Sequence, residues 1–224
     1  MLSEPVCTIV TIDGPSGAGK GTLSQLLAQR LGYHLLDSGA LYRLVALASL
    51  NKAIAVSDEA GLVTCAANLD VVFSPADAGV AVHLEGADVT AAIRQEAVSM
   101  RASEVAAIEP VRRALLQRQR DFAVAPGLVA DGRDMGTTVF ANAQHKFYLT
   151  ASAEARAQRR YQQLIERGEQ VDLAALIADI EARDQRDQSR ESSPLKPAAD
   201  AELIDSTHLS IEQVLAHMMV TIGT

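Results

Sequence analysis

The chain has 224 residues, 48% of them hydrophobic, which is enough for one sizeable core with a small inserted lobe. Its net charge of −8 argues against general affinity for nucleic acid or anionic membranes, and its two cysteines are too few for a disulfide framework. Residues 1–5 lack the basic start of a signal peptide, and no apolar run reaches the roughly 18 residues of a membrane helix, so we expect a cytoplasmic protein.

The first predicted element is an apolar strand, Val6–Ile12, which is followed by a glycine-rich segment and a helix-patterned segment, Leu23–Leu31. This order is typical of a loop that binds polyphosphate, and a purely structural glycine turn fits it poorly. Glycines let backbone N–H groups converge on an anion, and the helix dipole adds to their attraction. Lys20 supplies a mobile charge for the terminal phosphates, and Thr22 offers a hydroxyl to magnesium. The residues predicted to bind the triphosphate are Gly14, Pro15, Ser16, Gly17, Ala18, Gly19, Lys20, Gly21 and Thr22.

The next elements are a short apolar strand, Tyr33–Leu36, and a helix, Ser38–Leu50, with Ser38 near its N-cap. Ser38, Tyr42 and Arg43 are spaced to face one cleft, where they would offer two hydroxyls and a guanidinium to a phosphate. An ordinary N-cap with an exposed Arg43 explains the same residues equally well.

Residues from about 53 to 91 break the alternation of strands and helices. Segments Asp70–Phe73 and Val80–Leu84 alternate in polarity like two strands, with turn-rich connections at 74–79 and 85–88. We therefore expect a small inserted lobe with a short antiparallel sheet, followed by helices to about Phe122.

Alternation resumes in the second half of the chain. Predicted strands are Leu128–Ala130, Lys146–Leu149 and Glu202–Ile204, and predicted helices are Ala153–Arg167, Leu173–Arg186 and Ile211–Val220. Together with the first two strands they predict an α/β fold: a five-stranded parallel sheet with helices on both faces. A ligand should bind at the carboxyl ends of these strands.

Charged residues follow the third predicted core strand. Asp131 stands where phosphate-loop proteins place a second acidic residue, near magnesium or its water shell. Arg133 and Asp134 then fall in the loop above the sheet, where ligands bind. A glycine turn with solvated charges is the alternative, and the position at a strand end favours the site.

A third charged group lies near the end of the predicted helix after residue 173. Arg183, Asp187 and Arg190 are spaced i, i+4 and i+7, so they share one helix face. Such a face would hold a ribose hydroxyl between two phosphate clamps. A solvated ladder of ion pairs has the same spacing.

Basic residues also cluster on the helix after the fourth strand. This segment is either a lid over the phosphates or a solvated basic face, and its arginines are Arg156, Arg159 and Arg160. The chain has 16 arginines and four lysines, a balance that fits an anion-handling site but also follows from codon bias.

Six segments resemble the bacterial cytidylate kinase family of P-loop nucleoside monophosphate kinases. The Gly21-Thr22 ending of the loop is already closer to these kinases than to GTP switches. The segments are IVTIDGPSGAGKGT at 9–22, LLDSGALYR at 35–43, LEGADVT at 84–90, ADGRDMGT at 130–137, RDQRDQSR at 183–190 and PLKPAADAELIDST at 194–207. The resemblance implies a core at about 1–40, 125–150 and 195–224, a lobe for the monophosphate at about 41–124 with a small sheet at about 69–90, and a lid at about 153–170.

The resemblance also implies roles for individual residues. The acceptor phosphate would be held by Ser38, Tyr42, Arg43, Arg133 and Arg190, and the ribose by Arg183 and Asp187. The cytosine would be read by Ser103, Arg112 and Asp134, with Arg113 competing with Arg112. Catalysis would rest on Lys20, Arg133 and Arg190, and the lid arginines, Arg156, Arg159 and Arg160, would bind ATP.

The reaction implied is phosphoryl transfer from ATP to CMP and dCMP, without a general base, with Mg²⁺ held near Thr22 and Asp131. We expect a monomer whose partners are these nucleotides and neither nucleic acid nor membrane. Other readings are a kinase for UMP or AMP, a catalytically silent nucleotide-binding subunit, and a GTP-binding switch. The switch would use Asn51-Lys52 and the D-x-x-G motif at 58–61, although position 54 lacks the Asp that it needs.

Overall fold

The computed structural model describes residues 7–76, 79–166 and 168–223. The chain forms two compact units. We call residues 1–37 with 120–224 the core unit, and residues 38–119 the inserted unit.

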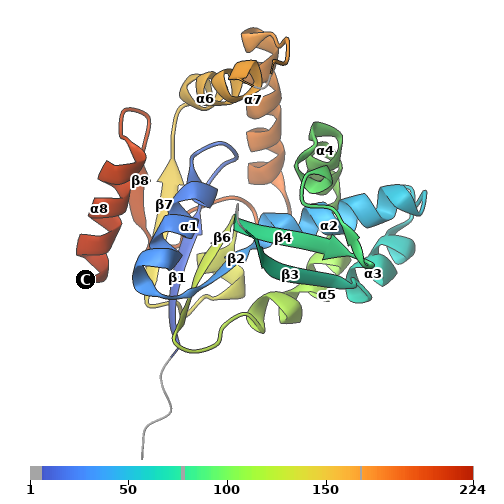
Figure 1. Cartoon of the computed structure of the whole chain (residues 1–224), viewed down its shortest axis with the longest axis horizontal. Coiled ribbons are helices and arrows are strands. Elements are labelled where there is room, and N and C mark those ends of the chain that lie inside the picture. The colour runs from blue at the N-terminus through green and yellow to red at the C-terminus, as the bar shows by residue number, and fades with distance from the viewer. Residues whose placement is uncertain (1–6, 77–78, 167, 224) are drawn as a thin grey trace, which may run out of the picture. The chain divides into compact units, whose positions relative to one another are not determined.

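The core unit is built on a parallel sheet of five strands in the order β2-β6-β1-β7-β8 (Figure 1). The strands are β1 (Thr8–Asp13), β2 (His34–Asp37), β6 (Gly127–Gly132), β7 (His145–Thr150) and β8 (Glu202–Asp205). Every residue of β6 is buried, as expected for a central strand covered on both faces. Asp13 pairs in register with Gly132 and Tyr148, so the carboxyl ends of β1, β6 and β7 meet at one edge. The predicted five-stranded parallel sheet is confirmed.

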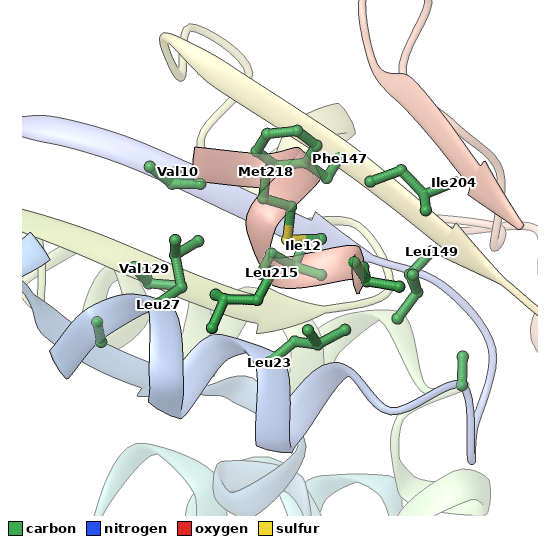
Figure 2. Close-up of a cluster of buried hydrophobic side chains, with 13 residues drawn as sticks. Val10, Ile12, Leu23, Leu27, Val129, Phe147, Leu149, Ile204, Leu215 and Met218 are labelled. Carbon is green, nitrogen blue, oxygen red and sulfur yellow. The ribbon is translucent and has the colours of Figure 1, made fainter. Parts of the chain in front are cut away.

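The helices of the core unit are α1 (Lys20–Leu31), α6 (Ala153–Glu166), α7 (Leu173–Ser189) and α8 (Ile211–Ile222), with a short π-helix, η2 (Met135–Val139). Figure 2 shows how α1 and α8 pack on the sheet through a cluster of buried apolar side chains that includes Val10, Ile12, Leu23, Leu27, Phe147, Leu149, Leu215 and Met218. Burial of these side chains fixes the start of α1 above the ends of the strands.

The inserted unit combines helices with a small antiparallel sheet in the order β3-β4-β5. Its strands are β3 (Val71–Ala76), β4 (Gly79–Leu84) and β5 (Ala87–Asp88). Its helices are α2 (Ser38–Asn51), α3 (Glu59–Ala67), the 3₁₀ turn η1 (Ala92–Arg94), α4 (Glu96–Val105) and α5 (Glu109–Arg120), which ends on the first residue past this unit. The predicted antiparallel sheet is confirmed.

Several local predictions need correction. Helix α3 was not predicted, because its run of Ala, Gly, Thr and Cys has no clear apolar period. The Asp58 carboxylate caps α3 by accepting from the Gly61 N–H at 2.9 Å, so the D-x-x-G motif is a helix start. The turn predicted at 85–88 is shorter in the structure. Within this stretch only Glu85 and Gly86 have the positive φ of a tight turn, and the next two residues form the third strand, β5.

Some predictions fall outside the described residues: the expected lack of a signal peptide at 1–5, the strand start at Val6, part of the connector at 77–78, and the helix end at Arg167. Along the described part of the chain, no helix is long and apolar enough to cross a membrane.

Candidate active site

The glycine-rich loop lies between the end of β1 and the start of α1. Gly14 has a φ of 148°, and a Cβ there would lie 1.9 Å from the carbonyl oxygen of Leu149. Gly17 and Gly19 also have positive φ, and Gly19 is the N-cap of α1. Only glycine allows the loop this close to β7, and the resulting path leads directly into the N–H groups that open α1.

Lys20 is buried at the start of α1. Its Nζ donates to the carbonyl oxygen of Pro15 at 2.8 Å and lies 3.9 Å from Oδ1 of Asp131. Burial, with the nearby charge of Arg133, lowers the pKa of Lys20 to about 7, although Asp131 and Asp13 act in the opposite direction. A polyphosphate bound here would favour the charged ammonium, because an adjacent anion raises the pKa of an amine.

Asp131 is the next-to-last residue of β6 and lies close to the first turn of α1. Its Oδ2 lies 3.7 Å from the position that a Cβ on Gly21 would take, and the next residue, Thr22, is exposed. A carboxylate and a hydroxyl are hard oxygen donors, and Mg²⁺ in nucleotide sites takes one or two such ligands together with phosphate oxygens and water. The residues present therefore fit a magnesium ion carried by a triphosphate.

Asp13 links the glycine-rich loop to the segment that carries Arg133 and Asp134. Its two carboxylate oxygens accept from the N–H groups of Met135 at 2.8 Å and Gly136 at 2.7 Å. Burial raises the pKa of Asp13 to about 7, and these two hydrogen bonds act against the shift. Asp13 was not predicted as a site residue, and its one signal in the sequence is a carboxyl at the end of an apolar strand, directly before Gly14.

Asp187 of α7 forms a cluster with the half-buried Arg133 and with Arg190, which is the C-cap with extended backbone just past α7 and so does not lie on the predicted helix face. Nε of Arg133 lies 3.0 Å from Oδ2 of Asp187, and Nη2 of Arg190 lies 3.8 Å from Oδ1. Burial favours a raised pKa for Asp187, but the charges of Arg133, Arg190 and Arg183 outweigh it and lower the pKa overall. Asp187 and Arg190 are buried, so they are not part of a solvated ladder.

The arginines of α6 have different surroundings. Arg156 is buried and donates to the carbonyl oxygen of Ser16 at 3.0 Å and to the carboxylate of Asp184. Arg159 donates to the carbonyl oxygen of Ser206, and Arg160 is half-buried. Asp184 was not predicted, because the spacing of residues along α7 gives no sign of a partner on α6.

In the inserted unit, Arg112 lies with its guanidinium carbon 5.4 Å from the centre of the Tyr42 ring. It also donates to the carbonyl oxygen of Ala106 at 3.0 Å. Ser38 and Ser103 are buried, and Arg43 is half-buried. Arg113 is exposed and forms an ion pair of 2.8 Å with Glu109. The structure thus brings Arg112 and Tyr42 together and leaves Arg113 on the surface.

The sequence matches the family described as Cytidylate kinase over residues 10–224. The chain belongs to the cytidylate kinase family. This membership gives it cytidylate kinase activity, an ATP-dependent phosphoryl transfer.

Curated members of the cytidylate kinase family match nearly the whole chain. The cytidylate kinase of Aeromonas salmonicida (strain A449) is 56% identical over 211 residues, covering 94% of this chain and 92% of that protein. The cytidylate kinase of Aliivibrio salmonicida (strain LFI1238) is 54% identical over 214 residues, covering 96% of each. Among solved structures, a shikimate kinase from Bacteroides thetaiotaomicron is 12% identical with a TM-score of 0.47, covering 97% of this chain and 99% of that one, a likeness that says nothing of activity.

Proposed function

We propose that this cytidylate kinase transfers the γ-phosphoryl group of ATP to CMP and to dCMP by in-line displacement without a general base. The observation that carries the proposal is the cluster of Arg133, Asp187 and Arg190 in the same unit as the glycine-rich loop. Arg133 follows two residues after Asp131, the partner of Lys20, and its charge lowers the pKa of Lys20. A protein that bound ATP alone would need the loop but not a second set of arginines.

A general base is unnecessary because the attacking atom is a phosphate oxygen. The second pKa of a phosphate monoester is about 6, so the acceptor is mostly dianionic at neutral pH. The ATP phosphates and the acceptor phosphate repel each other, and nearby lysine and arginine side chains would offset this repulsion. Lys20 would stabilise the transferring group, while Arg43, Arg133 and Arg190 hold the acceptor in line.

We propose that ATP binds with Mg²⁺, which Thr22 and Asp131 would hold. The ion would supply neutralisation of the charge on the transferring phosphates. Asp131 also attracts the Lys20 ammonium, so its carboxylate serves both cations of the donor site.

We assign the binding of CMP to Ser38, Tyr42, Arg43, Ser103, Arg112, Arg133, Asp134, Arg183, Asp187 and Arg190. The Asp134 carboxylate would accept from the exocyclic amine of cytosine, and Arg183 with Asp187 would bind the ribose hydroxyls. UMP has a carbonyl oxygen in place of that amine, and this oxygen would face the carboxylate unfavourably.

Segment 153–170 would act as a lid that brings Arg159 and Arg160 to the ATP phosphates and excludes water. Its closing on both substrates would suppress ATP hydrolysis in the absence of CMP. An ATPase rate that is fast and independent of CMP would overturn this part of the proposal.

We also propose that the protein is a monomer of 23.8 kDa, which a sedimentation measurement would check.

The experiment that tests the function is a coupled assay of ADP release with CMP, dCMP, UMP and AMP as acceptors. We expect CMP and dCMP to have the highest kcat/KM, with a background ATPase far below either. A ranking led by UMP or AMP would contradict the assignment of Asp134, Ser103 and Arg112 to the base.

A further inference from the structure

The guanidinium of Arg156 makes several contacts with its own protein. Its Nε donates to the carbonyl oxygens of Ala151 at 2.9 Å and Ser152 at 3.3 Å. Its Nη1 donates to Ser16 O at 3.0 Å and to Oδ1 of Asp184 at 3.1 Å, and its Nη2 donates to the other oxygen of Asp184. An arginine has five N–H donors, so most of those of Arg156 are already used.

These contacts join three segments of the core unit. Ser16 lies inside the glycine-rich loop, Arg156 lies on α6, and Asp184 lies on α7 next to Arg183. Asp184 is also one turn before Asp187, which holds Arg133 and Arg190. Helices α6 and α7 lie against each other (Figure 1), so the Arg156–Asp184 pair sits within this contact. A short chain of contacts therefore runs from the loop to the acceptor arginines.

We infer that Arg156 and Asp184 are positioning residues, which fix the glycine-rich loop relative to α7 so that donor and acceptor phosphates are held at the right spacing. The link to phosphoryl transfer rests on the proposed function. Arg156 then acts through Ser16 and Asp184, and direct binding of ATP phosphates is left to Lys20, Arg159 and Arg160.

Burial favours positioning over direct phosphate binding. The side chain of Arg156 is 4% exposed and that of Asp184 is 17% exposed. To reach a phosphate, Arg156 would have to leave the carboxylate and strand a partly buried anion beside another anion, which is strongly unfavourable. A mobile lid arginine needs the opposite surroundings.

The two roles predict different results for matched variants. If Arg156 positions the loop, Arg156→Lys and Asp184→Asn each lower kcat by roughly a hundredfold, because small misplacements of the reacting groups are costly. The double variant then loses no more than Arg156→Lys alone, because both changes break one link. Lysine keeps the charge, but its single nitrogen cannot reproduce the planar fork through which Arg156 donates to Ala151, Ser16 and both oxygens of Asp184 at once. Glu181→Gln, an exposed neutralisation on α7, is the matched control and keeps wild-type kcat.

A direct role on phosphate gives the reverse pattern. Arg156→Lys would then keep most of kcat, because lysine serves phosphate as a point charge. Asp184→Asn would tighten ATP binding, because it removes an anion and frees the guanidinium. Additive losses in the double variant would equally overturn the inference.

Hydrogen exchange measured without nucleotide gives a test that is independent of activity. We expect Arg156→Lys and Asp184→Asn to speed exchange of the Leu23 amide about tenfold relative to the wild type and Glu181→Gln. This amide donates to the carbonyl oxygen of Gly19 at 3.1 Å, where the loop enters α1, and it exchanges only when that hydrogen bond opens. Unchanged exchange there overturns the inference. If wild type and Glu181→Gln both fail to phosphorylate CMP, the proposed function fails, while the exchange result still decides the positioning role.

Discussion

Arg133 of the core unit and Arg112 of the inserted unit are held in different ways. In the core unit the cations next to the glycine-rich loop are paired with carboxylates: Lys20 with Asp131, and Arg133 with Asp187. In the inserted unit Arg112 lies on the ring of Tyr42 and donates to a backbone carbonyl. Paired carboxylates fix a guanidinium in one orientation, which suits repeated alignment of phosphates. The contacts of Arg112 with the ring and the carbonyl orient its planar guanidinium, which suits hydrogen bonding to a neutral base.

The largest effect expected is that of Lys20→Ala. The variant should lose roughly a thousandfold in kcat, because a preorganised cation at the transferring group is removed. Its Kd for CMP should stay within about threefold of the wild type, since the loss falls on the transition state. Steady-state kinetics and CMP titration check both values, with the exposed Lys52→Ala as the control. A parallel loss of CMP affinity would show that the two substrates share Lys20.

Asp187→Asn should destabilise the core unit, because it leaves the buried Arg190 and the half-buried Arg133 without their carboxylate. We expect a loss of about 3 kcal/mol in the free energy of unfolding at pH 7. The folded pKa of Asp187 lies below its ordinary value of 3.8, so its contribution is present above that pH and is lost as the pH falls through the folded pKa.

Denaturant unfolding at pH 7 and at progressively lower pH checks this prediction. The gap between wild type and Asp187→Asn should narrow below about pH 4, where the wild-type carboxyl begins to protonate. Asp179→Asn, an exposed change on the same helix, should leave the unfolding free energy within about 0.5 kcal/mol of the wild type. A gap that stays constant with pH would mean that the ion pairs do not account for the stability.

Asp13→Ala tests the connection between the glycine-rich loop and η2. It leaves the N–H groups of Met135 and Gly136 without their acceptor, at a cost of about 2 kcal/mol in unfolding free energy. Asp13→Asn retains one acceptor oxygen and should cost less. Thermal unfolding ranks the three proteins, and an Asp13→Ala variant as stable as the wild type would show that η2 is held by other contacts.

Asp134→Ala tests whether a residue of the core unit contributes to base selection, because Asp134 lies in that unit and is assigned to the cytosine. We expect kcat/KM for CMP relative to UMP to fall by at least about tenfold, through loss of one base-specific hydrogen bond. The coupled assay with both acceptors measures the ratio. An unchanged ratio would leave base selection to the inserted unit alone.

The parallel sheet was predictable because each strand contains a short apolar run, and most of these runs are followed by aspartate or glycine, as in 128–132. The glycine-rich loop was predictable because its residues are consecutive. Asp13 and Asp184 were not, because their partners lie 122 and 28 residues away, and no spacing rule reports such pairs. Arg112 and Arg113 could not be separated either, since neighbours on a helix differ by about 100° and only packing shows which side is buried. The roles of the site residues in binding remain predictions.

The most direct test of the division of labour is the ratio of kcat/KM for CMP to kcat/KM for UMP, measured in the wild type, Arg112→Ala and Arg133→Ala. We predict that Arg112→Ala lowers this ratio by at least about tenfold, because a base contact is lost. Arg133→Ala should keep the ratio but strongly lower kcat/KM for both acceptors, because Arg133 is assigned to the acceptor phosphate, which CMP and UMP share. A ratio that is unchanged in Arg112→Ala, or that falls equally in Arg133→Ala, would contradict the account.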